Sequence, residues 1–136
     1  MPSTDPNIKV HTLLLVMRPV SDPDDILPLI TQKDRNILVT KDTSNILALC
    51  KEHPEIELVM ISMELAVEYG MATIEETHML IPEVPIIVLS NYVTLETIRL
   101  ATMLGCKEIM QSPVDRSTLN AVIEKYLPKI SKTPNQ

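Results

Sequence analysis

The sequence contains neither tryptophan nor phenylalanine, and its 136 residues include only three tyrosines. This shortage leaves no platform on which the bases of single-stranded nucleic acid could stack. The twelve lysines and arginines are scattered and the formal net charge is −6, whereas binding to phosphate backbones needs clustered cations. These features argue against direct nucleic-acid binding.

Glycine is nearly as scarce, with Gly70 and Gly105 the only two. A dinucleotide-binding GxGxxG loop or a Walker loop cannot be written with two distant glycines. The GxSxG elbow of α/β-hydrolases is missing as well. The sequence therefore excludes these nucleotide-binding and hydrolase classes.

The cysteines and histidines form no recognisable site. Cys50 and Cys106 are isolated, without a CxxC motif, which suits a reducing cytoplasm, and we interpret both as small buried hydrophobic residues. His11, His53 and His78 have no metal-ligand spacing, and we interpret all three as surface residues. No metal or cofactor is expected.

The apolar content of 45% supports a folded core. Met1–Lys9 lacks the pattern of a secretory signal, and the longest apolar run, Leu13–Met17, is far short of the ~20 residues that span a bilayer. We expect a cytoplasmic protein without membrane contact, and Met1 with the polar C-terminal segment favours a stand-alone chain. The expected organisation is a single domain over 1–136, with a core over about 10–128 and polar tails over 1–9 and 129–136.

Five short runs are rich in valine, isoleucine and leucine. They are continuously apolar where half-exposed strands would alternate, which is typical of parallel strands covered by helices on both faces. The five predicted strands are Thr12–Met17, Asn36–Thr40, Leu58–Ser62, Pro85–Ser90 and Glu108–Gln111.

Amphipathic stretches with capping residues predict helices between these strands. One helix starts at 42–44 and ends at His53-Pro54, and another follows Thr94, with Leu95 and Ile98 inward, and stops at Gly105. A last helix starts at Asp115 or Ser117 and ends before Pro128.

Two further helices complete the prediction. The stretch from Gly70 to Leu80 is helical, with Met71, Ile74 and Met79 inward. The first helix begins at 22–25, and Pro28 is tolerated if it lies in the first turn.

The alternation of strands and helices predicts a (βα)5 domain. Right-handed crossovers then give a doubly wound parallel sheet of order 2-1-3-4-5. Ligands in such sheets bind at the carboxyl ends of the strands. The residues expected there are Met17–Asp22, Ser62–Glu64, Ser90–Tyr92 and Gln111–Pro113.

Several segments together resemble the receiver domain of bacterial response regulators. Leu58–Ser62 is similar to the family's third strand, and Gly70 follows Ser62 by eight residues, as a glycine does in the family. Pro85–Asn91 resembles the fourth strand with its terminal hydroxyl, and Gly105–Val114 resembles the entry to the fifth strand and its closing Lys-Pro. The resemblance covers about Thr12 to Leu127 and implies the flavodoxin-like fold, a three-layer sandwich.

The residues that carry the family's phosphotransfer are largely replaced. Ser62 stands at the phosphoacceptor aspartate, Met17 and Arg18 at the acidic pair that holds Mg²⁺, and Ser112 at the lysine. Ser90 retains the hydroxyl, and Pro113 is a candidate for the cis proline. The switch aromatic corresponds to Ile109.

The resemblance therefore implies a pseudo-receiver in two-component signalling that is not an enzyme and acts through protein–protein contacts. Its implied partners are a kinase, an output domain or a second copy. The implied contact face comprises Thr94–Leu104, Glu108–Gln111 and Asp115–Leu127.

Two alternatives remain open. A receiver could accept phosphate through Glu64 or an acid among Asp22, Asp24 and Asp25, although these aspartates also suit a helix start. The chain could instead be an unrelated flavodoxin-like module that binds a small ligand. Arg18 could pair with Glu64 as a fixed cation, or both could be solvated loop residues.

Overall fold

The computed structural model describes residues 10–17, 26–30, 35–41, 43–62 and 68–127. Its five strands form one sheet in the order β2-β1-β3-β4-β5, and each neighbouring pair is parallel. The strands are β1 His11–Met17, β2 Arg35–Thr40, β3 Ile56–Ser62, β4 Ile86–Ser90 and β5 Glu108–Gln111. The predicted strands and their order are confirmed.

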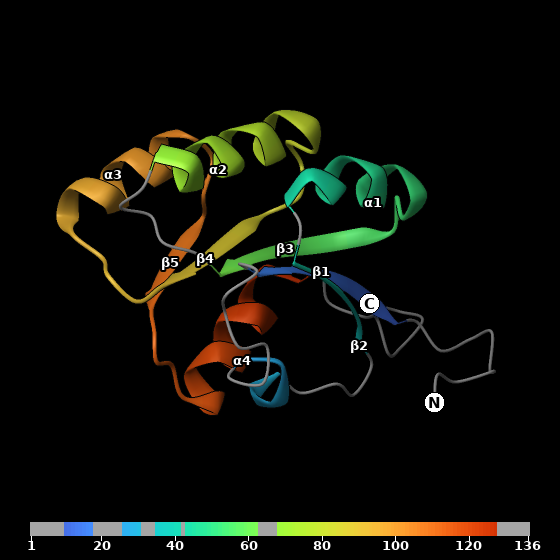
Figure 1. Ribbon diagram of the computed structural model, residues 1–136. Helices are drawn as coiled ribbons and strands as arrows, with labels where there is room; N and C mark the ends of the chain where they lie inside the picture. The colour runs from blue at the N-terminus through green and yellow to red at the C-terminus, as the bar shows by residue number, and fades with distance from the viewer. Residues whose placement is uncertain (1–9, 18–25, 31–34, 42, 63–67, 128–136) are drawn as a thin grey trace, which may run out of the picture.

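Helices cover both faces of this sheet (Figure 1). One face carries α1 Ile46–Glu52, preceded by the 3₁₀ turn η3 Thr43–Asn45, together with α2 Glu68–Leu80 and α3 Leu95–Met103. The other face carries α4 Arg116–Tyr126 and the 3₁₀ turn η2 Leu27–Leu29. Within the described residues, η2 stands where the first helix was predicted, and Pro28 lies in its first turn.

The core consists of two apolar layers separated by the sheet. All seven residues of β1 are buried. Because successive strand residues point to opposite faces, Leu14 and Val16 pack under α1, α2 and α3, while Leu13, Leu15 and Met17 pack against α4. Alternate side chains of one continuously apolar strand thus contribute to both core layers.

Two predicted helix caps are present. The Thr94 side chain accepts a hydrogen bond from the Thr97 backbone N–H at 3.1 Å, and Thr97 Oγ1 accepts one from the Thr94 backbone N–H at 2.9 Å. Asp115 caps α4 by accepting from the Thr118 backbone at 3.1 Å and from its hydroxyl at 2.7 Å. These hydrogen bonds hold the pKa of Asp115 below its ordinary value.

Several side chains predicted to point inward are exposed instead. Met71 and Ile74 are buried as predicted, but Met79 is exposed, and Leu95 and Ile98 of α3 are 68% and 39% exposed. On α3 only Ala101 is buried, so this small residue, and not the larger ones, is the point of contact with the sheet. The predicted inward orientation of Met79, Leu95 and Ile98 is wrong. At about 100° per residue, Met79 lies about 140° around α2 from buried Ile74, and Leu95 lies about 120° around α3 from buried Ala101.

His11 is also not the surface residue that the sequence predicted. It is 9% exposed, and its Nδ1 lies 2.8 Å from Glu57 Oε1 on the neighbouring strand β3. Because β1 lies between β2 and β3, even its first residue is covered. His53 is half-buried, with Nδ1 3.1 Å from Glu55 Oε2.

A polar network joins β2 to α4. The Arg35 guanidinium, whose side chain is 7% exposed, donates to Asn120 Oδ1 at 2.8 Å and to Glu124 Oε2 at 2.9 Å. Asn120 in turn donates to the carbonyl oxygen of Leu29 at 2.8 Å. One cation thereby ties η2, β2 and α4 together.

Gly105 ends α3 as predicted, with a φ of 117° that L-residues rarely adopt. It also packs against the half-buried His78 of α2, because a Cβ at position 105 would lie 2.7 Å from His78 Cβ and closer still to Cγ. Both constraints require glycine here.

Replacing Gly105 with alanine is expected to lower the free energy of unfolding by about 2–4 kcal/mol, from backbone strain together with overpacking. Urea denaturation measures this loss. The double variant Gly105→Ala, His78→Ala should recover only part of the overpacking, because alanine at position 78 keeps its Cβ, and none of the backbone part. An unchanged stability of the single variant would contradict the close packing of α2 on this turn.

Candidate functional site

The carboxyl ends of the strands bring together most of the residues singled out in the sequence. Met17 of β1 pairs with Ser62 of β3, and Ser62 pairs with Leu89 of β4. Ser90 pairs with Gln111, and the Ser112 N–H donates to the Ser90 carbonyl at 2.8 Å. Among these residues, this edge of the sheet thus carries one thioether, three serine hydroxyls and the Gln111 amide.

Met17 belongs to the core. Its exposed fraction is 0%, and it packs in the layer that contains Leu15, Met60 and Leu89. A carboxylate in this environment would require a compensating partner, since burying an isolated charge is costly. The end of β1 therefore extends the apolar core to the edge of the sheet.

Ser62 is the last residue of β3 and is buried beside Met17. A serine hydroxyl is weakly nucleophilic unless an adjacent base activates it. The side chains considered as an altered acidic site, Glu64 and the acids of 22–25, lie outside the described residues, as does Arg18. The structure thus places Ser62 and Met17 together and leaves the hypothesised Arg18–Glu64 pair as a prediction.

The Ser90 hydroxyl is engaged in the turn after β4. It donates to the Tyr92 carbonyl at 3.1 Å, and the Tyr92 N–H lies 3.4 Å from its Oγ. The neighbouring peptide bond Ser112-Pro113 is cis, which confirms the expectation for Pro113. Ser112 is half-buried.

The described side chains at these strand ends offer Mg²⁺ no carboxylate, the ligand that it prefers, because they are a thioether, hydroxyls and the Gln111 amide. Within the described residues, no three histidine, cysteine, aspartate or glutamate side chains are placed to hold a metal ion. In the same part of the chain, no helix is both long and apolar enough to cross a membrane.

Both thiols are buried, as the sequence predicted. Burial raises the pKa of Cys106 to about 11, and it raises the pKa of Cys50 as well. Cys106 Sγ donates to the Glu108 carbonyl at 3.0 Å. Because the thiolate is the reactive form, neither cysteine is poised for nucleophilic chemistry.

We expect the native protein to react slowly with Ellman's reagent at pH 8, where a thiol of pKa about 11 is thiolate in only about one molecule per thousand. The thiolate fraction rises with pH, so labelling should accelerate toward pH 10. The matched control is the same protein in guanidinium chloride, in which both thiols should react at once. Fast labelling of the folded protein would contradict the burial of these side chains.

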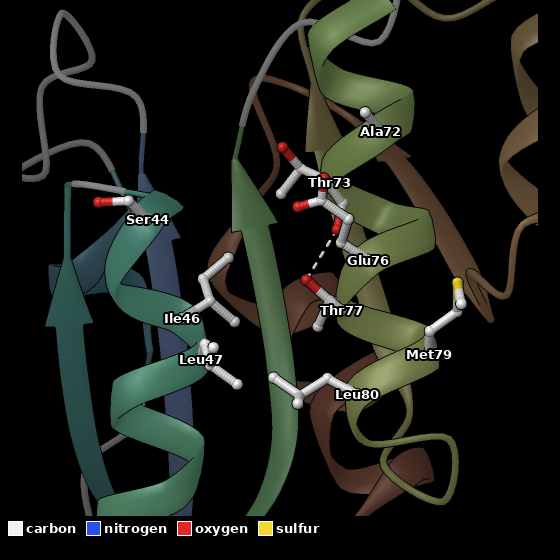
Figure 2. Close-up of a pocket in the computed structure, with 9 residues that line it drawn as sticks. All are labelled: Ser44, Ile46, Leu47, Ala72, Thr73, Glu76, Thr77, Met79 and Leu80. Carbon is white, nitrogen blue, oxygen red and sulfur yellow. Dashed lines mark hydrogen bonds between the residues drawn. The ribbon is translucent and has the colours of Figure 1, made fainter.

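A groove between α1 and α2 was not predicted from the sequence. Figure 2 shows side chains of both helices around it, and its volume is about 680 Å³. On α2 the lining includes Ala72, Thr73 and Thr77. Small and β-branched residues at this spacing are the signal that could have revealed it.

Solved structures with the same fold are receiver domains and related modules. A response regulator from Thermotoga maritima superposes with a TM-score of 0.75 and 17% identity, covering 86% of this chain and 97% of that one. A putative pilus assembly protein (CpaE) from Burkholderia thailandensis superposes with a TM-score of 0.73 and 16% identity, covering 86% of this chain and 98% of that one. A CheY-like receiver domain protein from Methanospirillum hungatei has a TM-score of 0.71 and 19% identity, with 86% of this chain and 93% of that one covered. The chain therefore has the flavodoxin-like fold of receiver domains, as the sequence indicated.

Among curated proteins, the chain matches the transcriptional regulatory protein ZraR of Escherichia coli strain K12. The two are 31% identical over 71 residues, which is 52% of this chain and 16% of ZraR. The chain therefore matches only a small part of the length of that relative. No protein-family profile matches the chain.

Proposed function

We propose that this chain is a receiver module of two-component-type signalling that acts by binding another protein, without phosphorylation of an aspartate. The observation that carries the proposal is the pairing of Met17 with Ser62 at the ends of β1 and β3. In the receiver family that the sequence resembles, these positions hold an acid of the metal-binding pair and the phosphoacceptor.

The chemistry of the replaced positions supports this proposal. An aspartyl phosphate forms by attack of a carboxylate, and the transferring phosphoryl group needs cationic stabilisation. A buried thioether supplies no oxygen ligand for Mg²⁺, and Ser112 supplies no charge where the family has lysine. The remaining hydroxyl, that of Ser90, already donates a hydrogen bond to the Tyr92 carbonyl in the turn after β4.

We expect no Mg²⁺-dependent amide shifts around Ser62, Ser90 and Ser112 when the ¹⁵N-labelled chain is titrated with beryllofluoride, a mimic of an aspartyl phosphate. The control titration contains fluoride and Mg²⁺ but no beryllium. Saturable, Mg²⁺-dependent shifts would reject the proposal and favour phosphorylation at Glu64 or at an acid of 22–25.

The proposed contact face is that of α3, β5 and α4. On α3 the largest apolar side chains are turned to solvent, with Met103 81% and Leu95 68% exposed. Leu100 of α3 and Tyr92, shortly before the helix, are exposed as well. Exposed apolar groups gathered on one element are typical of a surface that another protein covers.

Polar groups border this surface on β5 and α4. The Tyr126 hydroxyl donates to Glu108 Oε1 at 2.8 Å, and Lys125 Nζ lies 3.6 Å from the same oxygen. The hydrogen bond to the Glu108 carboxylate raises the pKa of Tyr126, since losing the phenolic proton would break it. An apolar centre with a charged rim resembles the anatomy of protein interfaces.

Incorporating benzoylphenylalanine at Met103 should yield a photo-crosslinked protein adduct in cells of the source organism. The matched control carries the same group at Lys51, an exposed position on α1. We expect at least a fivefold stronger adduct from position 103, measured by immunoblotting, since the label there lies within the proposed apolar interface. Equal adducts from both positions would contradict the assignment of this face.

A further inference from the structure

The groove between α1 and α2 exists because these helices do not interdigitate. Packed helices usually fill the space between them with large apolar side chains. On α2 the lining residues are mostly small or polar, and α1 has only seven residues. The lining comprises Ser44, Ile46, Leu47, Ala72, Thr73, Glu76, Thr77, Met79 and Leu80.

The groove has an apolar end and a polar end (Figure 2). Leu47 and Leu80 point toward one another at one end, with Ile46 nearby, and Ser44 and Thr73 lie toward the other. Between them the Thr77 hydroxyl donates to the Thr73 carbonyl at 2.7 Å. The Thr77 hydroxyl proton is thus used within α2, and this part of the wall needs no polar group from a ligand.

Glu76 is the charged residue among the nine that line the groove. Within the described residues, no cation forms a salt bridge with it, whereas Glu57, Glu124, Glu55 and Glu108 all have partners. Glu75, the next residue on α2, is exposed as well but does not line the groove. The electrostatic field of Glu76 at the polar end therefore favours a cation and disfavours an anion.

We propose that this groove binds a small cationic amphiphile, with its apolar body against Ile46, Leu47 and Leu80 and its ammonium group at Glu76. A volume of about 680 Å³ lies within the ~300–1,000 Å³ of small-molecule sites. The site is independent of the proposed function, since it uses neither the strand ends nor α3 and α4.

The test uses decylammonium chloride as the cationic probe and sodium decanoate as its anionic counterpart of equal length, both below their aggregation concentrations. Titrated into the full ¹⁵N-labelled chain, decylammonium should shift amides of 44–47 and 72–80 saturably. Decanoate should bind about fivefold or more weakly, the difference that one partly exposed ion pair supports.

Two neighbouring substitutions separate a specific contact from net charge. Glu76→Gln should weaken decylammonium binding about fivefold and remove the preference over decanoate, whereas Glu75→Gln, which loses the same charge outside the groove, should leave both unchanged. Ala72→Leu fills the groove from an exposed position and should abolish binding of both probes while the thermal unfolding midpoint of the free protein is kept.

Four results would each overturn the proposal. These are no saturable shifts with either probe, shifts that map to the exposed apolar residues of α3, equal effects of the two glutamine variants, and saturation of the groove by a basic amphipathic peptide where decylammonium produces none. The beryllofluoride and crosslinking experiments bear on other elements, so failure here is distinguishable from failure of the proposed signalling function.

Discussion

Burial of the central strands on both faces is the constraint on which the rest of this structure depends. Every side chain of β1 is buried, and from Leu58 onward β3 is buried throughout. The apolar area removed from water by such strands contributes ~25 cal/mol per Å², the main favourable term of folding. Both faces of the sheet must then be covered, and parallel strands joined by crossover helices achieve this.

The same constraint explains the character of the strand ends. Met17 continues the apolar run of β1 to its last residue, and its neighbour Ser62 is buried with it. A sheet edge that holds Mg²⁺ needs carboxylates that are solvated or coordinated, and a strand that is apolar to its end supplies neither. The thioether of Met17 therefore contributes to core packing and offers Mg²⁺ no oxygen ligand.

Most of the fold could be predicted because its signals are local. Continuous apolar runs identified the five strands, Thr94 and Asp115 marked helix starts, and crossover handedness fixed the strand order. The adjacency of Met17 and Ser62 also follows, since parallel strands end at the same edge. The family resemblance, confirmed at the level of the fold, gave these positions their interpretation.

Features that depend on the lateral position of an element could not be predicted. The exposure of Met79 and Leu95 reflects how each helix is turned about its axis on the sheet, with Ile74 and Ala101 facing the strands. The burial of His11 beside Glu57 depends on the strands flanking β1. The groove is set by the separation of two helices, a tertiary quantity, although small residues on α2 accompany it.

The guanidinium of Arg35 has a consequence for the order of events during synthesis. Its acceptor Asn120 lies 85 residues further along the chain, and Glu124 lies 89 residues further. At translation rates of ~5–20 residues per second, an interval of roughly 4–18 s separates the emergence of these partners. Throughout that interval the Arg35 guanidinium lacks both of these acceptors, so the hydrogen bonds that join β2 to α4 form only after the last helix has emerged from the ribosome.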